Sequence, residues 1–95
     1  MYVSQNSVSE RLFIKNKRGL HARASAKFVQ MVDRYEATVL VTKDGQTVSG
    51  NSIMGLMMLA AAPGCSIDVV ATGEDAEAVL QALNDLIDGR FGEDE

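Results

Sequence analysis

The sequence has little of several residue types on which particular protein classes depend. Its 95 residues include one cysteine, one proline, one histidine and no tryptophan. The single cysteine, Cys65, cannot form an internal disulfide, which favours a reducing compartment over the cell exterior. The chain offers no cluster of cysteine and histidine side chains for zinc. We therefore expect neither a metal site nor another cofactor.

Long apolar runs and an excess of positive charge are also missing. The longest apolar stretch, residues 53–63, is far shorter than the roughly 20 residues of a membrane-spanning helix. The polar N-terminus lacks the basic start and apolar run of a secretory signal. The formal net charge is −4, whereas nucleic-acid binding requires a basic face. These absences predict a cytoplasmic protein without membrane insertion or a nucleic-acid partner.

What remains is enough for one small domain, because 46% of the residues are hydrophobic. Apolar spacing and turn residues predict the order β-α-β-β-α-β-α. The expected strands are 10–15, 36–42, 46–49 and 65–71. The expected helices are 22–34, 52–59 and one that starts within 72–75 and is terminated by Gly89. We predict an α+β open-faced sandwich: a four-stranded antiparallel sheet with three helices on one face. The domain spans residues 1–95, with flexible ends at 1–8 and 91–95.

Local signals define the ends of these elements. Asp44 and Gly45 favour a two-residue hairpin turn, because both positions require positive φ. Asn51 or Ser52 can cap the second helix, and Pro63-Gly64 ends that region. Acidic residues at 74, 75 and 77 suit the first turn of the last helix, whose dipole is positive there. Its expected buried side consists of Val79, Leu80, Leu83, Leu86 and Ile87.

Basic residues gather around the only histidine of this acidic chain. Lys15, Lys17, Arg18, Arg23 and Lys27 all lie within a few residues of His21. Such a cluster favours an anionic ligand or partner at this point. A solvated, charged loop is the alternative that composition alone leaves open.

His21 is expected at the start of the first helix, where backbone N–H groups have no partner within the helix. The N–H groups of Ala22, Arg23 and Ala24 and the positive end of the helix dipole form an anion site. Neutral imidazole is a nucleophile near neutral pH, and Arg23 can clasp a phosphate. Gly19 allows the preceding loop to bend tightly. The alternative is a surface histidine that only caps the helix.

Other kinds of histidine site are less compatible with the sequence. No second metal ligand follows His21 at helical spacing. Ser25 lies one turn further along the helix, but no acidic residue is expected in position to orient the histidine ring. The spacing therefore argues against a Ser-His-Asp arrangement.

Two separate motifs carry a resemblance to a known family. The stretch Gly-Leu-His-Ala-Arg-Ala-Ser at 19–25 and the stretch Asn-Ser-Ile-Met-Gly-Leu-Met at 51–57 resemble HPr. HPr is the histidine-containing phosphocarrier of the phosphoenolpyruvate-dependent phosphotransferase system, and its element order matches roughly residues 8–90. The resemblance implies that His21 accepts a phosphoryl group on Nδ1 from Enzyme I and passes it to EIIA-type proteins. The chain would then be a carrier in sugar uptake or its regulation, and not an enzyme.

Further roles follow from the same resemblance. Arg23 matches the arginine that contacts the phosphoryl group. Ser52 matches the serine phosphorylated by HPr kinase/phosphorylase in lineages that have this enzyme. The partner-docking positions would be Ile53, Met54, Met57 and Lys27.

The chain departs from the family pattern at two positions beside the histidine. Ala24 replaces the usual proline and restores a backbone N–H that can reach a phosphate or solvent. Arg18 stands where the family often has asparagine or serine, and it adds a second cation for the phosphate.

Independently of the resemblance, Ser52 is expected to cap the second helix and to contribute about 1 kcal/mol to the stability of the fold. The consecutive apolar residues at 56–59 cannot all face one core, so some apolar surface is expected outside, as a docking face or as loosely packed methionines. Cys65 is expected to be a small buried residue at the start of a strand.

Two alternative functions are also compatible with the sequence. One is a nitrogen-regulatory relative that acts only in signalling. The other is an anion-binding module that is not phosphorylated.

Overall fold

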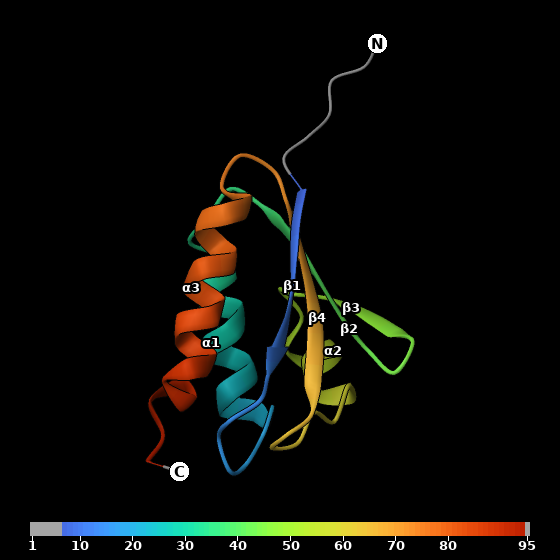
Figure 1. The fold of residues 1–95 in the computed structure, drawn as a ribbon, viewed down its shortest axis with the longest axis vertical. Coiled ribbons are helices and arrows are strands. Elements are labelled where there is room, and N and C mark those ends of the chain that lie inside the picture. The colour runs from blue at the N-terminus through green and yellow to red at the C-terminus, as the bar shows by residue number, and fades with distance from the viewer. Residues whose placement is uncertain (1–6, 95) are drawn as a thin grey trace.

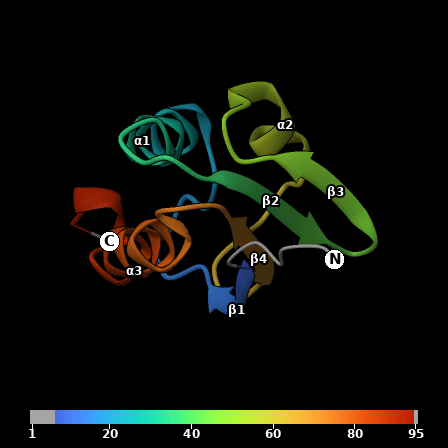
Figure 2. The ribbon, with the colours of Figure 1, turned by 90° about the horizontal axis from the view of Figure 1, so that it is seen from above.

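The computed structural model describes residues 7–94, which form four strands and three α-helices. In chain order these are β1 (Ser7–Phe13), α1 (Ala22–Val32), β2 (Thr38–Lys43), β3 (Gln46–Ser49), α2 (Ile53–Met58), β4 (Ser66–Thr72) and α3 (Ala76–Asp88). The strands form one antiparallel sheet in the order β1-β4-β2-β3. The helices lie on one side of this sheet (Figures 1 and 2). The predicted open-faced sandwich is confirmed.

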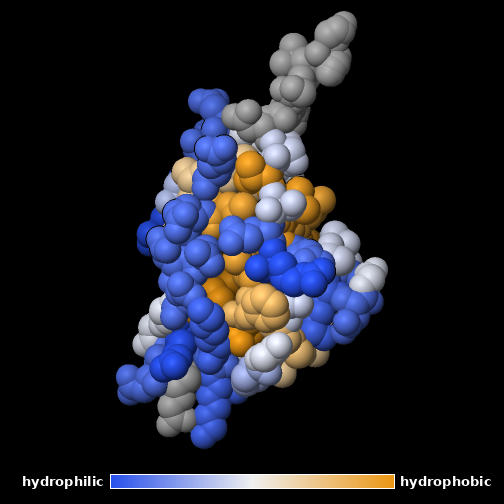
Figure 3. Space-filling view, viewed as in Figure 1, coloured by the Kyte–Doolittle hydropathy of each residue, from blue (hydrophilic) through white to orange (hydrophobic). Residues whose placement is uncertain are grey.

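Alternation along the strands separates a buried face from an open one. In β4, Ile67, Val69 and Ala71 are fully buried against the helices, whereas the residues between them face outward. Strands alternate in this way when only one face of a sheet is covered. The open face still carries apolar side chains, with Phe13 55% and Leu40 43% exposed. Apolar residues are visible between the hydrophilic border along α3 and the hairpin in Figure 3.

The helices bury the faces that the sequence pattern predicts. In α1 the buried side chains include Ala24, Phe28 and Val32, which recur every four residues. In α3 four of the five expected residues are buried, and the fifth, Leu86, is partly buried against the core. Because α1 contacts both α2 and α3, this helix is held on two sides.

The hairpin between β2 and β3 has the predicted two-residue turn. Asp44 and Gly45 have φ angles of 52° and 80°, and Lys43 pairs with Gln46 directly beside them. Left-handed conformation at both central residues matches the twist of the flanking strands.

Several expected details differ in the structure. Strand β1 extends from Ser7 to Phe13 instead of 10–15, because its register with β4 begins at the Ser7–Thr72 pair. Helix α3 begins at Ala76, so Glu74 and Asp75 precede it, and a carboxylate oxygen of Asp75 accepts from the Glu36 N–H at 2.8 Å instead of capping the helix. Cys65 is only half-buried and precedes β4.

The residues after α3 fold back onto the domain. Helix α3 ends at Asp88 with Gly89 as its C-cap, and a short 3₁₀ turn, η1 (Arg90–Gly92), follows. Phe91 is only 1% exposed and belongs to the core, although flexibility was expected from this residue onward. Burial of its ring holds the turn in place. Flexibility of residues 1–6 and 95 stays a prediction, because they lie outside the described residues.

Candidate functional site

His21 caps the first helix with its side chain. Its backbone is extended (φ −76°, ψ −177°), and its Nδ1 accepts a hydrogen bond from the Arg23 N–H at 3.2 Å. The His21 carbonyl accepts the first helical bond, from the Ser25 N–H at 2.9 Å. One of the unpaired N–H groups of the helix start is thus satisfied by the imidazole itself. The ring nitrogen that faces this donor must carry a lone pair.

The loop before His21 is fixed by contacts with the segment after α2. Gly19 has a φ of +66°, and a Cβ at this position would lie 2.2 Å from the Ala61 carbonyl oxygen. The same carbonyl accepts from the Leu20 N–H at 2.9 Å. On the helix side, the buried Ser25 hydroxyl donates to the Leu20 carbonyl at 3.2 Å. Gly19 is therefore required both for its conformation and for this close approach.

A carboxylate lies against the other nitrogen of the histidine ring. The Oε2 atom of Glu93 is 2.6 Å from Nε2 of His21, and each side chain is 17% exposed. The buried Asn16 amide donates to Oε1 of Glu93 at 3.0 Å and to the Gly19 carbonyl at 2.9 Å. The expectation that no acid would orient His21 was wrong. Glu93 is 72 residues away in sequence, and only the acidic composition of the C-terminal segment pointed to it.

These contacts act on the ionisation of Glu93. Partial burial raises the pKa of the Glu93 carboxyl, but hydrogen bonds from His21 and Asn16 and the charges of His21 and Arg18 lower it by more. The net pKa of Glu93 lies below its ordinary value, so this side chain is a carboxylate at neutral pH.

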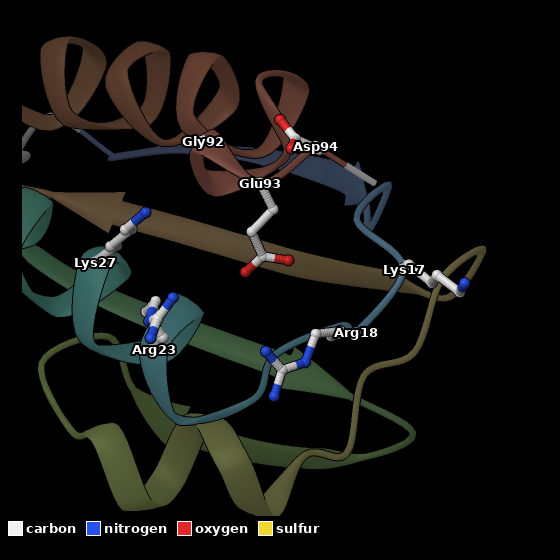
Figure 4. A pocket seen from close by; sticks show the side chains of 7 residues that line it. All are labelled: Lys17, Arg18, Arg23, Lys27, Gly92, Glu93 and Asp94. Carbon is white, nitrogen blue, oxygen red and sulfur yellow. The ribbon is translucent and has the colours of Figure 1, made fainter.

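Basic residues and the C-terminal segment surround a pocket of about 550 Å³ beside the histidine. Figure 4 shows the Glu93 carboxylate pointing into the space between Arg18, Arg23 and Lys27, whereas the Lys17 side chain points away from this space. The predicted basic cluster is thus present, and it is partly neutralised by the carboxylates of Glu93 and Asp94.

Not every predicted residue of the basic cluster lines this pocket. Lys15 pairs instead with Asp88 at the end of α3. Lys27 does line it, but its Nζ donates to the carbonyl of Phe91. Ala22 and Ala24 lie in the first turn of α1, the first exposed and the second fully buried. Phosphate binding by Arg18, Ala22 and Ala24 stays a prediction. Among residues 7–94, no group of three or more His, Cys, Asp or Glu side chains is arranged to hold a metal ion.

The second predicted motif forms a cap and an exposed apolar surface. Ser52 caps α2, its Oγ accepting from the Gly55 N–H at 3.0 Å. Leu56 and Leu59 are buried, as the apolar run requires. The exposed side chains of α2, which we call the α2 patch, are Ile53 (40%), Met54 (70%), Met57 (40%) and Met58 (63%). Because α2 packs against α1, this patch belongs to the same side of the sheet as the histidine helix.

Comparison with known proteins identifies the family. The family model described as the PTS HPr component phosphorylation site matches residues 8–89. The chain is 54% identical over 82 residues to phosphocarrier protein HPr of Neisseria meningitidis serogroup A, covering 86% of this chain and 92% of the relative. The chain belongs to the HPr family. The predicted resemblance is confirmed.

Other HPr proteins support this assignment. HPr of Xylella fastidiosa is 45% identical over 83 residues, covering 87% of this chain and 93% of the relative. A crystal structure of HPr from Thermoanaerobacter tengcongensis superposes with a TM-score of 0.88 at 41% identity, covering 93% of this chain and 99% of that one. This HPr-family chain is accordingly a phosphocarrier component of the phosphotransferase system. None of its described helices is long and apolar enough to cross a membrane. Glu93 lies beyond residue 89, where the match to the family model ends.

Proposed function

We propose that His21 accepts a phosphoryl group on Nδ1 from Enzyme I and passes it to EIIA-type acceptors. The observation that carries this proposal is the position of Nδ1 at the helix start, where it accepts from the Arg23 N–H. Nδ1 therefore holds the lone pair that a nucleophile needs. The proposed carrier is phosphorylated stoichiometrically, acts in the cytoplasm in sugar uptake or its regulation, and turns over no substrate of its own.

The transfer step requires one bond to form and one to break. The Nδ1 lone pair of His21 attacks phosphorus, and the bond from phosphorus to the donor group breaks with its electron pair kept by the donor. The Arg23 N–H, which now bonds to Nδ1, is then available to a phosphoryl oxygen, as is the Arg23 guanidinium. Arg18 adds positive charge at the same pocket. Onward transfer reverses these changes at Nδ1.

Partner binding is assigned to the α2 patch. Its methionines present a flexible apolar surface, which suits a carrier that must dock on a donor and on several acceptors. Ile53, Met54 and Met57 are the proposed docking residues. Lys27 lines the pocket, and its positive charge is proposed to attract an acidic surface of the partner.

We also propose that an HPr kinase/phosphorylase phosphorylates Ser52 and thereby regulates the carrier. Ser52 is half-buried, and its hydroxyl caps α2. A phosphate there would be tolerated by the helix start but would place negative charge beside the α2 patch. The expected consequence is weaker docking of Enzyme I without loss of the fold.

The main proposal is tested by incubating the protein with phosphoenolpyruvate and Enzyme I. The expected product carries one phosphoryl group that is labile in acid and stable in base, and His21→Ala remains unlabelled. Equal labelling of His21→Ala would contradict the proposal. Transfer from the labelled protein to a sugar-specific or to a nitrogen-regulatory EIIA distinguishes the two branches of the phosphotransferase system.

A further inference from the structure

Glu93 occupies a position that the histidine chemistry described above does not require. Its carboxylate contacts Nε2, the ring nitrogen that is not proposed to react, and it comes from a segment beyond the family match. Its contact partners show whether it blocks the site or organises it.

The hydrogen bonds of the ring select one tautomer. A backbone N–H points at Nδ1 and a carboxylate oxygen lies against Nε2. An N–H can only donate and a carboxylate can only accept, so Nε2 must carry the proton. In this tautomer Nδ1 keeps its lone pair.

The carboxylate is itself oriented by a buried side chain. Both partners of the Asn16 amide, the Gly19 carbonyl and Glu93 Oε1, are acceptors, so the amide nitrogen must face them. Asn16 is fully buried, which fixes its position. One Asn16 amide thus connects the loop before His21 with the carboxylate that contacts the ring.

The segment that delivers Glu93 is anchored on both sides. Arg90, Phe91 and Gly92 have φ angles of 57°, 55° and 77°, a left-handed run that is unfavourable for the two residues with a Cβ. The buried Phe91 ring and the bond from Lys27 Nζ to the Phe91 carbonyl stabilise it. The left-handed turn directs the next residue, Glu93, toward the start of α1 (Figure 4).

We propose that Glu93 is a positioning residue that holds His21 in the tautomer with a proton on Nε2 and a free lone pair on Nδ1. When Nδ1 forms its bond to phosphorus, Nε2 keeps its proton and the ring becomes an imidazolium beside the Glu93 carboxylate. When the phosphorus–nitrogen bond breaks in onward transfer, its electron pair returns to Nδ1. No proton has to enter or leave the ring in either step.

The opposite role, a strap that blocks the site, is less compatible with this geometry. The two nitrogens of an imidazole point away from each other, and Glu93 occupies only the Nε2 side. The phosphoryl group on Nδ1 and the carboxylate on Nε2 can therefore be present together.

The experiment compares the wild type with Glu93→Gln, and uses Glu77→Gln as the matched control. Glu77 is an exposed carboxylate in the first turn of α3, at the far end of the helix that leads to Glu93. Nitrogen-15 NMR of His21 reports its tautomers in the unphosphorylated protein. We expect the ratio of the Nε2–H to the Nδ1–H form to fall roughly ten-fold in Glu93→Gln and to stay unchanged in Glu77→Gln.

Phosphoryl transfer from Enzyme I provides the second measurement and rests on the proposed function. With the carrier as the varied substrate, we expect kcat to fall roughly ten-fold in Glu93→Gln at an unchanged KM, because the ring is less well oriented. An unchanged tautomer ratio, faster transfer, or a change in KM alone would overturn the inference. If the wild type itself takes up no phosphoryl group, the proposed function fails, while the tautomer ratio still tests Glu93.

Discussion

At the scale of single residues, Arg23 contributes to the site in two ways, through its backbone N–H and through its charged side chain. Its backbone N–H donates to Nδ1 of the His21 ring, whereas its guanidinium lines the pocket. Arg23→Ala keeps the N–H and removes only the charge. A charge-assisted hydrogen bond contributes about 1.5–3 kcal/mol, so we expect phosphoryl acceptance to slow roughly ten- to hundred-fold.

The matched control for this prediction is Arg34→Ala. Arg34 is an exposed arginine in the turn that follows α1, at the end opposite His21. Its loss changes the net charge equally but should leave the transfer rate within about two-fold, since exposed charges at this distance are screened. Equal slowing in both variants would mean that net charge, and not a local contact, is responsible.

Gly19 permits an equally specific prediction about stability. Gly19→Ala combines an unfavourable positive φ with a Cβ placed 2.2 Å from a backbone oxygen. Gly64→Ala has the unfavourable φ, +86°, but open space around the new methyl group. We expect Gly64→Ala to lower the free energy of unfolding by about 1 kcal/mol and Gly19→Ala by at least twice as much, measured by urea denaturation. Similar losses would show that the loop can move away from Ala61.

The site was predictable at this scale wherever the chemistry is local in sequence. The cap, the N–H donors and the neighbouring arginines all follow from the position of His21 at a helix start. Glu93 and Asn16 could not be found in this way, because their roles depend on where the chain returns after α3. A buried asparagine in a charged loop gives no signal until its partners are known.

At the scale of elements, the residue that caps α2, Ser52, is also the proposed regulatory site. Asparagine, aspartate and serine cap helices almost equally well. Ser52→Asn and Ser52→Asp should therefore both keep the stability of the wild type within about 0.5 kcal/mol in thermal or urea unfolding. Only Ser52→Asp adds charge beside the α2 patch, and we expect it alone to accept a phosphoryl group from Enzyme I more slowly.

Each variant excludes a different explanation. Slower acceptance in Ser52→Asn would point to the shape of the cap instead of its charge. Acceptance by Ser52→Asp at the wild-type rate would remove the basis for regulation at Ser52.

The elements themselves were largely predictable, because their signals are periodic. Helix α1 and the return strand β3 begin at the expected residues, and the hairpin turn is the one that Asp44 and Gly45 require. The ends of β1 and α3 were displaced by partners from elsewhere in the fold. Asp75, for example, bonds to the Glu36 N–H, and this long-range contact competes with its use as a helix cap.

At the scale of the whole molecule, residues 89–94 pack back against the start of the domain, where Glu93 contacts Asn16 and His21. The first loop and the last turn meet at His21, so the site exists only when the complete domain is folded. Apolar burial explains why the last turn is held, since Phe91 joins the core. The sequence pattern could not predict this, because one aromatic residue in an acidic segment has no periodicity.

Because Glu93 contacts Asn16 and His21 only in the folded domain, its ionisation is coupled to folding. Its folded-state pKa is lowered, so the folded protein holds its proton less tightly than the unfolded chain does. The resulting stabilisation is present above the unfolded carboxyl pKa of about 4.3 and is lost as the pH falls through the folded value. In urea denaturation we expect the wild type to exceed Glu93→Gln in unfolding free energy at about pH 7, and this difference to shrink toward pH ~3. A difference independent of pH would show that the Glu93 carboxylate is not coupled to the fold, and the contact with His21 would then be too weak to orient the ring.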